Sequence, residues 1–221
     1  MAGNVAPNIV DNGLVLYLDA ANIKSYPTTG TTWTDLSKFN NGGALTNGPT
    51  FNTNNGGSIV FDGTNDYVDI GSNIQNYSSF TTSIWVNYLV FDSVGSTGWR
   101  SPLGDDSQSF SYHILFLQGI IYLGVSSGFI GNPYVGVTHN IVNVNNWYNF
   151  VITKNSSDSV SFYQNGVLLG TQIKSGNVNV NKIGKGYVYD NVRCSNFSFY
   201  NRALTQEEIL QNYNIIKNRY L

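Results

Sequence analysis

The sequence predicts an all-β protein built as a two-sheet antiparallel sandwich, with one short α-helix at its C-terminal end. Short segments rich in β-branched and aromatic residues recur along the chain, and turn-forming residues separate them. Helical patterns do not alternate with these segments, which argues against parallel β-α-β units. Only the end of the chain has an amphipathic pattern with the period of a helix.

The composition fits a single large sandwich domain. Only 11% of the 221 residues are charged, whereas 41% are apolar and 14% aromatic. The 31 asparagines outnumber the 11 basic and 13 acidic residues taken together. Uncharged polar groups must therefore form most of the surface, as suits turns and loops rather than exposed helices. We expect a short N-terminal arm over residues 1–10 and one sandwich domain over residues 11–221.

Strand signals follow one another along the whole domain. The first is a near-continuous apolar run at Leu14–Asp19, and the longest spans Phe80–Phe91. A later segment, Trp147–Lys154, alternates as a half-buried strand does. The clearest hairpin is Ser159–Gln172, because its central Asn165-Gly166 pair favours the positive φ angles of a type I′ turn.

The closing segment predicts a helix over residues 205–218. Thr205 is a good N-cap, and Glu208 three residues later completes a capping box. Ile209, Tyr213 and Ile216 form one apolar stripe, which we expect to dock on the sandwich. The alternative is a helix that binds a partner.

A single cysteine, Cys194, excludes an intrachain disulfide and a cysteine-based zinc site. Its strand-like surroundings favour a buried, unreactive thiol over a reactive one.

Several motifs, taken in order, carry a resemblance to a known family. They are "GLVLYLDAANIKSYPTTGTTWTDLS", "GGALTNGPTF", "GGSIVFDGTNDYVDI", "WYNFVIT", "YQNGVLLG" and "FYNRALTQEEI". From about Asn12 to the C-terminus the chain resembles the laminin-G-like, concanavalin-A-like jelly-roll family, in its bacterial and viral branch. The resemblance implies a jelly roll of two antiparallel sheets, and a protein that binds glycans or proteins without doing chemistry.

The opening stretch, "NIVDNGLVLYLDAANIKSY", resembles stand-alone domains in structural proteins of tailed bacteriophages. That resemblance implies a place on the virion surface, as a capsid decoration, a head fibre or a tail-associated adhesin.

Three aspartates crowd the stretch "FDGTNDYVDI" at Phe61–Ile70. In one interpretation Asp62 and Asp66 cap the backbone N–H groups of a tight turn between two strands. In the other, which the resemblance implies, they provide oxygen ligands to a calcium ion. A second family loop, Asp35–Gly43, has Lys38-Phe39 where the family has Gly-Asn, which counts against a cation there.

Glycan binding needs aromatic rings that stack on sugars and polar groups that meet hydroxyls. We expect both in loops, above all in Ser96–Gln108, because binding residues concentrate in loops on a rigid scaffold. The candidate ligand-binding residues are Trp99, Arg100, Asp105, Asp106, Asn132, Tyr134, Tyr187 and Tyr189. Further candidates are Asn76, Tyr77, His139 and Asp190, whereas Trp33, Trp85 and Trp147 are expected in the core.

Hydrolysis is the disfavoured alternative. A glycosidase needs two carboxylates facing each other across the scissile bond, and the two glutamates, Glu207 and Glu208, are adjacent in the predicted helix. No strand carries the alternating acids of a jelly-roll glucanase, and no phosphate-binding or nucleophile motif occurs. We expect a protein that is not an enzyme.

The charge pattern and the hydropathy of the chain argue against some classes of partner. No cluster of lysines and arginines marks a nucleic-acid footprint. The first residues lack the basic and apolar regions of a secretory signal, and no apolar run is long enough for membrane insertion. We expect a virion-surface protein, alone or as a homo-oligomer, that adheres weakly to cell-surface glycans or contacts other virion proteins. The alternatives are a purely structural assembly subunit, and an extracellular protein exported by a non-classical route.

Overall fold

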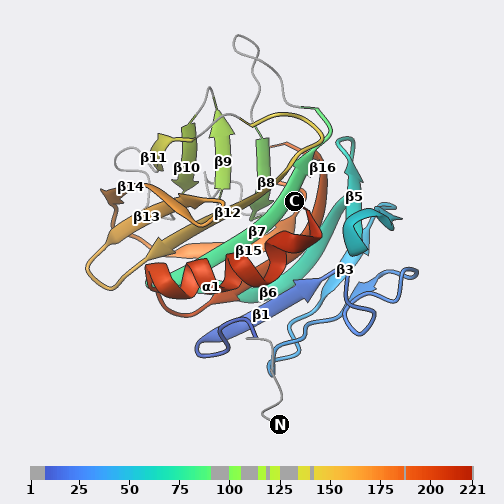
Figure 1. Cartoon of the computed structure of the whole chain (residues 1–221), viewed down its shortest axis with the longest axis horizontal. Coiled ribbons are helices and arrows are strands. Elements are labelled where there is room, and N and C mark those ends of the chain that lie inside the picture. Colours follow the sequence, from blue (N-terminus) through green and yellow to red (C-terminus); the bar gives the residue numbers. More distant parts are fainter. Residues whose placement is uncertain are drawn as a thin grey trace.

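Two eight-stranded antiparallel sheets make up the computed structural model of the chain (Figure 1). The model describes residues 8–90, 100–105, 114–117, 120–124, 134–139, 142–186 and 188–220. The predicted all-β sandwich with one short C-terminal helix is confirmed.

Sheet A has the order β14-β13-β12-β7-β16-β5-β4, and β1 pairs with β16 alongside β5. Its strands are β1 (Leu14–Asp19), β4 (Thr50–Asn52), β5 (Ser58–Asp62), β7 (Phe80–Tyr88), β12 (Trp147–Lys154), β13 (Ser159–Gln164), β14 (Val167–Ile173) and β16 (Asn191–Tyr200).

Sheet B has the order β11-β10-β9-β8-β15-β6-β3-β2. Its strands are β2 (Thr32–Trp33), β3 (Gly43–Thr46), β6 (Tyr67–Tyr77), β8 (Arg100–Gly104), β9 (Ile114–Leu117), β10 (Ile120–Gly124), β11 (Tyr134–Thr138) and β15 (Val178–Ile183).

The main core lies between the inner faces of the two sheets. Alternate residues of β7, such as Phe80, Ile84 and Val86, point inward and are fully buried, as are Val68 and Val180 from sheet B. The other residues of β7 point outward, because successive side chains of a strand alternate between its faces. The outer face of sheet A therefore carries Thr81, Ser83, Trp85 and Asn87.

Helix α1 (Gln206–Ile216) lies across this outer face of sheet A (Figure 1). Ile209 and Ile216 are buried beneath it, and the Tyr213 ring stacks on Trp85 with centroids 5.6 Å apart. The predicted apolar stripe thus faces the sheet. A short 3₁₀ turn, Lys217–Arg219, follows the helix.

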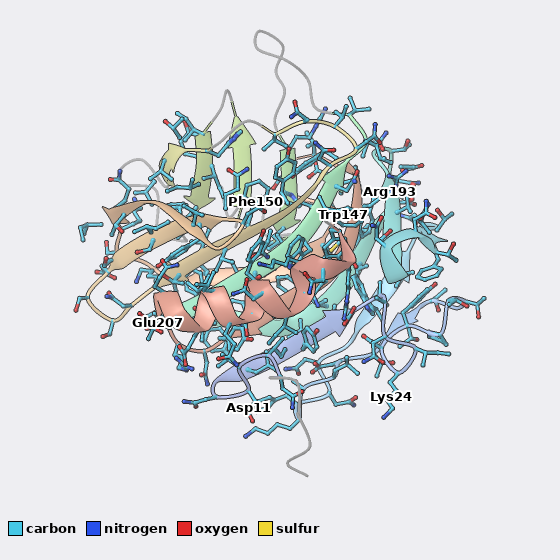
Figure 2. All side chains as sticks on the ribbon, viewed as in Figure 1. Asp11, Lys24, Trp147, Phe150, Arg193 and Glu207 are labelled. Carbon is cyan, nitrogen blue, oxygen red and sulfur yellow. The ribbon has the colours of Figure 1, made fainter. Side chains whose placement is uncertain are left out.

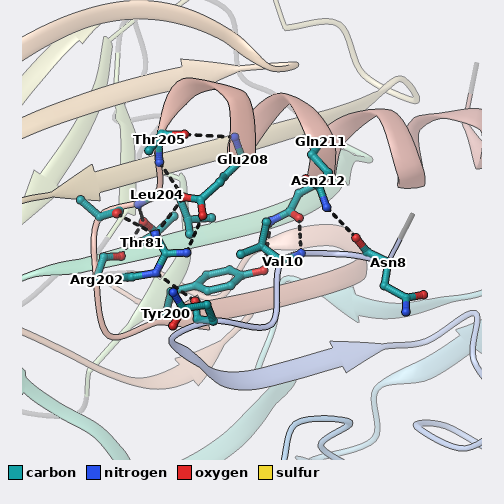
Figure 3. Close-up of polar contacts among 12 residues, drawn as sticks. Asn8, Val10, Thr81, Tyr200, Arg202, Leu204, Thr205, Glu208, Gln211 and Asn212 are labelled. Carbon is teal, nitrogen blue, oxygen red and sulfur yellow. Dashed lines mark hydrogen bonds and ion pairs between the residues drawn. The ribbon is translucent and has the colours of Figure 1, made fainter. Parts of the chain in front are cut away.

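The start of α1 has the predicted capping box (Figure 3). The Thr205 hydroxyl accepts a hydrogen bond from the Glu208 backbone, and the Glu208 carboxylate accepts one from the Thr205 backbone. Arg202 reinforces this cap with two hydrogen bonds to the same carboxylate, at 2.8 and 2.6 Å. These contacts lower the pKa of Glu208.

Residues 8–10 run beside the helix (Figure 3). The Val10 backbone N–H donates to the Asn212 side chain at 2.8 Å, and the Gln211 amide donates to the Asn8 carbonyl at 2.8 Å. Asn212 in turn donates to the Tyr200 hydroxyl on β16. The first residues of the expected arm, 1–7, lie outside the described residues.

Two further local predictions hold. Asn165 and Gly166 have φ angles of 54° and 78°, as the predicted type I′ hairpin requires. Cys194 is buried, and burial raises the pKa of its thiol. In the described part of the chain, no helix is long and apolar enough to cross a membrane.

The end of the chain is fastened to sheet A by a buried ion pair and an aromatic side chain. Arg219 donates two hydrogen bonds to the Asp19 carboxylate, at 2.7 and 2.9 Å. The Tyr220 ring packs against both Trp85 and Trp147, each with centroids 4.6 Å away. The Tyr220 hydroxyl donates to Ser195 at 2.6 Å.

Replacing Arg219 by Met should destabilise the fold. Asp19 is only 1% exposed, so the variant leaves a buried carboxylate without its charge partner. Such a loss costs about 3–5 kcal/mol in fully buried pairs, and we expect about 2–3 kcal/mol here because Arg219 is partly solvated. Urea unfolding of the variant and the wild type measures this change in the free energy of unfolding.

The double variant Asp19→Asn, Arg219→Met should recover part of that loss, since the uncompensated charge is gone. Lys24→Met, at an exposed position, is the control and should change the free energy of unfolding by less than about 0.5 kcal/mol. A single Arg219 variant as stable as the wild type would contradict the interpretation.

Candidate functional site

The expected binding loop at Ser96–Gln108 contains a strand. Arg100–Gly104 forms β8, and Leu103 pairs with Ile183 of β15 and is fully buried. The prediction of a loop there was wrong for these residues, because Leu103 packs into the sandwich core. The pairing of β8 with β9 shifts register between Arg100 and Leu103.

Four predicted ligand-binding residues, Trp99, Asp106, Asn132 and Tyr187, lie outside the described residues. The backbone of Tyr134 begins β11, but the structure does not describe its side chain. The candidate Tyr77 lies in β6 rather than in a loop, and its ring packs on Phe199 at 5.1 Å.

Arg100 begins β8, Asp105 follows its end, and Tyr189 lies in the segment after β15. The segment 184–190 turns back over β8, and the Gly184 N–H donates to the Pro102 carbonyl at 2.8 Å. Asp105 accepts a hydrogen bond from the Asn181 side chain at 3.1 Å. The role of Arg100, Asp105 and Tyr189 as ligand-binding residues stays a prediction.

The Tyr189 ring belongs to a cluster of tyrosines and lysines on sheet B. Lys185 lies 5.2 Å from the Tyr67 ring centre and 5.3 Å from the Tyr189 ring centre. Lys182 lies 5.3 Å from the Tyr67 ring and pairs with Asp69 at 2.9 Å. Ammonium groups thus already occupy these ring faces, which makes the cluster a poor platform for stacking a sugar.

Asp190 is a buried carboxyl group rather than a surface ligand. It is fully buried beside Tyr88, and burial raises its pKa from 3.8 to about 7. The Ser101 backbone and the Arg100 charge oppose that rise. Asp190 therefore holds a proton well above the range of an ordinary aspartate.

Asp62 and Asp66 both serve the turn between β5 and β6. The Asp62 carboxylate accepts from the Thr64 N–H at 2.7 Å, which lowers its pKa. The Asp66 carboxylate accepts from the Asp62 N–H at 3.2 Å, and burial raises its pKa. No group of three or more potential acidic, histidine or cysteine ligands occurs among the described residues. Since calcium takes about six to eight oxygens, this turn is a poor fit for it.

The family loop at Asp35 is likewise closed by protein groups. The Asp35 carboxylate accepts hydrogen bonds from the Tyr17, Ser37 and Asn41 backbones, each at 2.8 Å, and from the Ser37 hydroxyl at 2.6 Å. It is only 6% exposed. Its role is to fasten this loop to β1.

An open hollow of about 490 Å³ lies on the outer face of sheet A. Its floor is formed by three residues that lie side by side on neighbouring strands. Arg193 on β16 pairs with Asn87 on β7, and Asn87 pairs with Trp147 on β12. Figure 2 shows Trp147 and Arg193 close together near the C-terminal end of α1. Seven asparagines line the hollow: Asn52, Asn54, Asn55, Asn87, Asn145, Asn146 and Asn165.

The Trp147 ring is held in place at the wall of the hollow. Its indole N–H donates to the Asn55 side chain at 3.3 Å, and Tyr220 packs on the ring. The Asn55 amide also donates to the Arg219 carbonyl at 2.8 Å. The fastened C-terminal segment and the loop after β4 thus fix one aromatic side chain that is only half-buried.

Two polar atoms at the floor of this hollow are buried without a hydrogen-bond partner in the described structure. They are the Asn87 Oδ1 and the Arg193 Nε. Asn87 is only 2% exposed, and both residues line the hollow. Buried polar groups in proteins almost always have partners, but Trp33 Nε1 and Ser58 Oγ, away from the hollow, also lack one in the described structure.

Sequence reasoning missed this hollow. Trp147 was expected in the core like Trp33 and Trp85, which are 0% and 2% exposed, but it is half-buried instead. The available signal was the run Asn145-Asn146-Trp147, which places two amides directly before an aromatic residue. Nothing in the sequence shows that Arg193 and Asn52 join them.

The sequence of the chain matches a protein-family model. That family model describes the concanavalin A-like lectin/glucanases superfamily, and it matches residues 62–210. The chain belongs to the concanavalin A-like lectin/glucanase superfamily. No protein of curated function matches it.

Solved structures share this concanavalin A-like fold. The binding domain of botulinum neurotoxin serotype D superposes with a TM-score of 0.70 at 17% identity, over 93% of this chain and 52% of the neurotoxin domain. The binding domain of Paraclostridial Mosquitocidal Protein 1 gives 0.68 at 16% identity, over 93% and 53%. The serotype D domain in complex with N-acetylneuraminic acid gives 0.69 at 16%, over 93% and 51%. The chain spans about half the length of each, and at these identities the likeness shows the fold alone.

The buried Asp190 should make the stability of this concanavalin A-like domain depend on pH. Its folded pKa of about 7 lies above the ordinary 3.8, so between these values the folded state binds the proton more tightly than the unfolded chain. The free energy of unfolding should therefore fall as pH rises from about 4 to 7, by at most about 1.4 kcal/mol per pH unit. Asp190→Asn should remove this part of the slope.

Urea unfolding at several pH values between 4 and 8 tests this expectation. Asp62→Asn is the control, because the Asp62 pKa is lowered and its titration lies below this range. If wild type and Asp190→Asn have the same slope, the buried carboxyl is not the titrating group.

Proposed function

We propose that the chain is a non-enzymatic carbohydrate-binding domain, and that its sugar site is the asparagine-lined hollow beside Trp147. The observation that carries this is the combination, in one hollow, of a fixed, half-buried indole ring with many amide groups. An aromatic face provides an apolar platform, and the amides can both donate to and accept from sugar hydroxyls. Its volume of about 490 Å³ suits a small ligand.

The chemistry of the lining supports binding without turnover. None of the residues that line the hollow is an aspartate or glutamate, so it has no acid–base pair for a glycosidic bond. Glu207 and Glu208 lie in the first turn of α1, where Glu208 is bound by Arg202.

The structural neighbours support the same class of ligand. Two of them are complexes of neurotoxin binding domains with N-acetylneuraminic acid and with "SialylT". Since this chain matches about half of each neighbour, these complexes support sugar binding as a class and do not place the site.

We further propose a virion-surface setting, which rests on the resemblance of the first strand region to phage structural proteins. In that setting, weak binding at each site would be multiplied by many copies. Other virion proteins would then be its second kind of partner.

Replacing Trp147 by Ala should weaken sugar binding. A glycan array and NMR titrations with the glycans that bind should show at least about a tenfold loss of affinity, equivalent to 1.4 kcal/mol. Tyr189→Ala, in the tyrosine–lysine cluster on sheet B, is the matched control and should keep wild-type affinity.

The array should be run in calcium and in EDTA. Because the hollow has no carboxylate, binding there should survive EDTA, whereas a site at Asp62 and Asp66 should lose it. Binding that depends on Tyr189 but not on Trp147 would move the site to sheet B. No binding to any glycan would remove the proposed function.

A second candidate function, an assembly subunit, is favoured by the edge strand β14. Val167, Leu168 and Ile173 are 61%, 47% and 70% exposed on this edge of sheet A. An exposed edge with apolar side chains is a place where another chain can add.

If β14 is such an interface, the wild type should self-associate in light scattering, and Val167→Lys, Ile173→Lys should be monomeric. Lys174→Gln, adjacent to the strand, is the control and should associate like the wild type. A wild type that stays monomeric at high concentration would remove self-assembly through β14.

A further inference from the structure

Arg193 differs from the other three arginines of the chain in its charge environment. Arg202 makes two hydrogen bonds to Glu208, and Arg219 makes two to Asp19. The charge of Arg100 acts on the Asp190 carboxyl. In the described part of the chain, no carboxylate pairs with Arg193 and no hydrogen bond involves its Nε.

The strands beside Arg193 do not supply it with a charge partner. Arg193 lies between β5 and β7, where its cross-strand partners are Val60 and Asn87. Neither of these side chains carries a charge. A ligand that supplies an acceptor to the guanidinium would therefore add a charge-assisted hydrogen bond.

The electrostatics of the hollow favour an anion. Arg193 is the one charged residue among those that line it, and the others are amides and aromatic residues. A half-buried charge between uncharged walls attracts an opposite charge more strongly than one in open water. The planar guanidinium can also hold a carboxylate or a sulfate by two parallel hydrogen bonds.

The spacing fits a single sugar unit with an acidic substituent. Trp147 and Arg193 are separated by one strand, so their backbones lie about 10 Å apart, twice the strand spacing. A ring placed against Trp147 can therefore direct an attached anion to Arg193. Between them, Asn87 Oδ1 can accept a hydrogen bond from a sugar hydroxyl.

We propose that the hollow selects acidic glycans, with the carboxylate or sulfate held by Arg193 and the sugar ring placed against Trp147. This inference rests on the proposed function, since it names the ligand class of the same site. The tyrosine–lysine cluster on sheet B is another cationic surface, but Lys182 is already paired with Asp69 and Lys185 with two rings.

Binding of three probes, sialyllactose, a sulfated disaccharide and lactose, tests the proposal. In the wild type, at least one acidic probe should bind about tenfold or more tightly than lactose, and its binding should weaken with added salt. The indole N–H signal of Trp147 should shift during the titration, which locates the ligand without any substitution. The two acidic probes distinguish a carboxylate from a sulfate.

Arg193→Gln should lower the affinity for the acidic probe about tenfold and leave lactose affinity within twofold. Arg193→Lys keeps the charge but not the planar fork, so it should fall between wild type and Arg193→Gln. Lys185→Gln removes the same charge from sheet B and should change neither affinity. Circular dichroism and thermal unfolding confirm that each variant is folded.

Three outcomes would overturn the proposal. Equal affinity for lactose and the acidic probes, lost in Trp147→Ala, would leave the proposed function standing and remove the acidic selectivity. Inorganic sulfate that binds as tightly as the sulfated sugar would show an anion site without sugar recognition. No binding of any glycan would overturn the proposed function itself, and this inference with it.

Discussion

The alternation of side chains along β7 is the constraint around which the outer face of sheet A is organised. Once Ile84 and Val86 fill the core between the sheets, Trp85 and Asn87 must both point outward. Trp85 is too large and apolar to be left in water, so an element has to cover it. Helix α1 does this with Tyr213, and because it ends before Asn87, the remainder of the face is left as a hollow with a polar floor.

The C-terminal segment links the part of sheet A that α1 covers to the hollow. Arg219 binds Asp19, and Tyr220 fits between Trp85 and Trp147. The same segment offers the Arg219 carbonyl to Asn55, which in turn holds the Trp147 indole. The contacts that stabilise the last turn therefore also orient the aromatic wall of the hollow. Because the ring is already fixed, binding a ligand against it costs less side-chain conformational entropy.

The sequence predicted features whose causes lie within a few residues, and it failed where burial depends on distant elements. The capping box of Thr205 and Glu208 and the Asn165-Gly166 turn follow from local chemistry. Trp85 and Trp147 look alike in the sequence, both in strands and both on the outer face. They differ in exposure because α1 covers one and stops short of the other, and that distance is a property of the packed structure. For the same reason, the sequence predicts a loop where β8 lies, because β8 is held by its pairing with β15, a strand far away in the chain.

The abundance of asparagine has two physical causes that composition alone cannot separate. Asn55, Asn145 and Asn165 all have positive φ angles, so their presence is explained by the left-handed turns that asparagine tolerates. Asn87 cannot be explained this way, because it lies within a strand, where asparagine is disfavoured. It is nearly fully buried, and its carbonyl oxygen has no partner in the described structure. The turn chemistry that explains the other three asparagines therefore does not explain Asn87, which lies at the floor of the hollow.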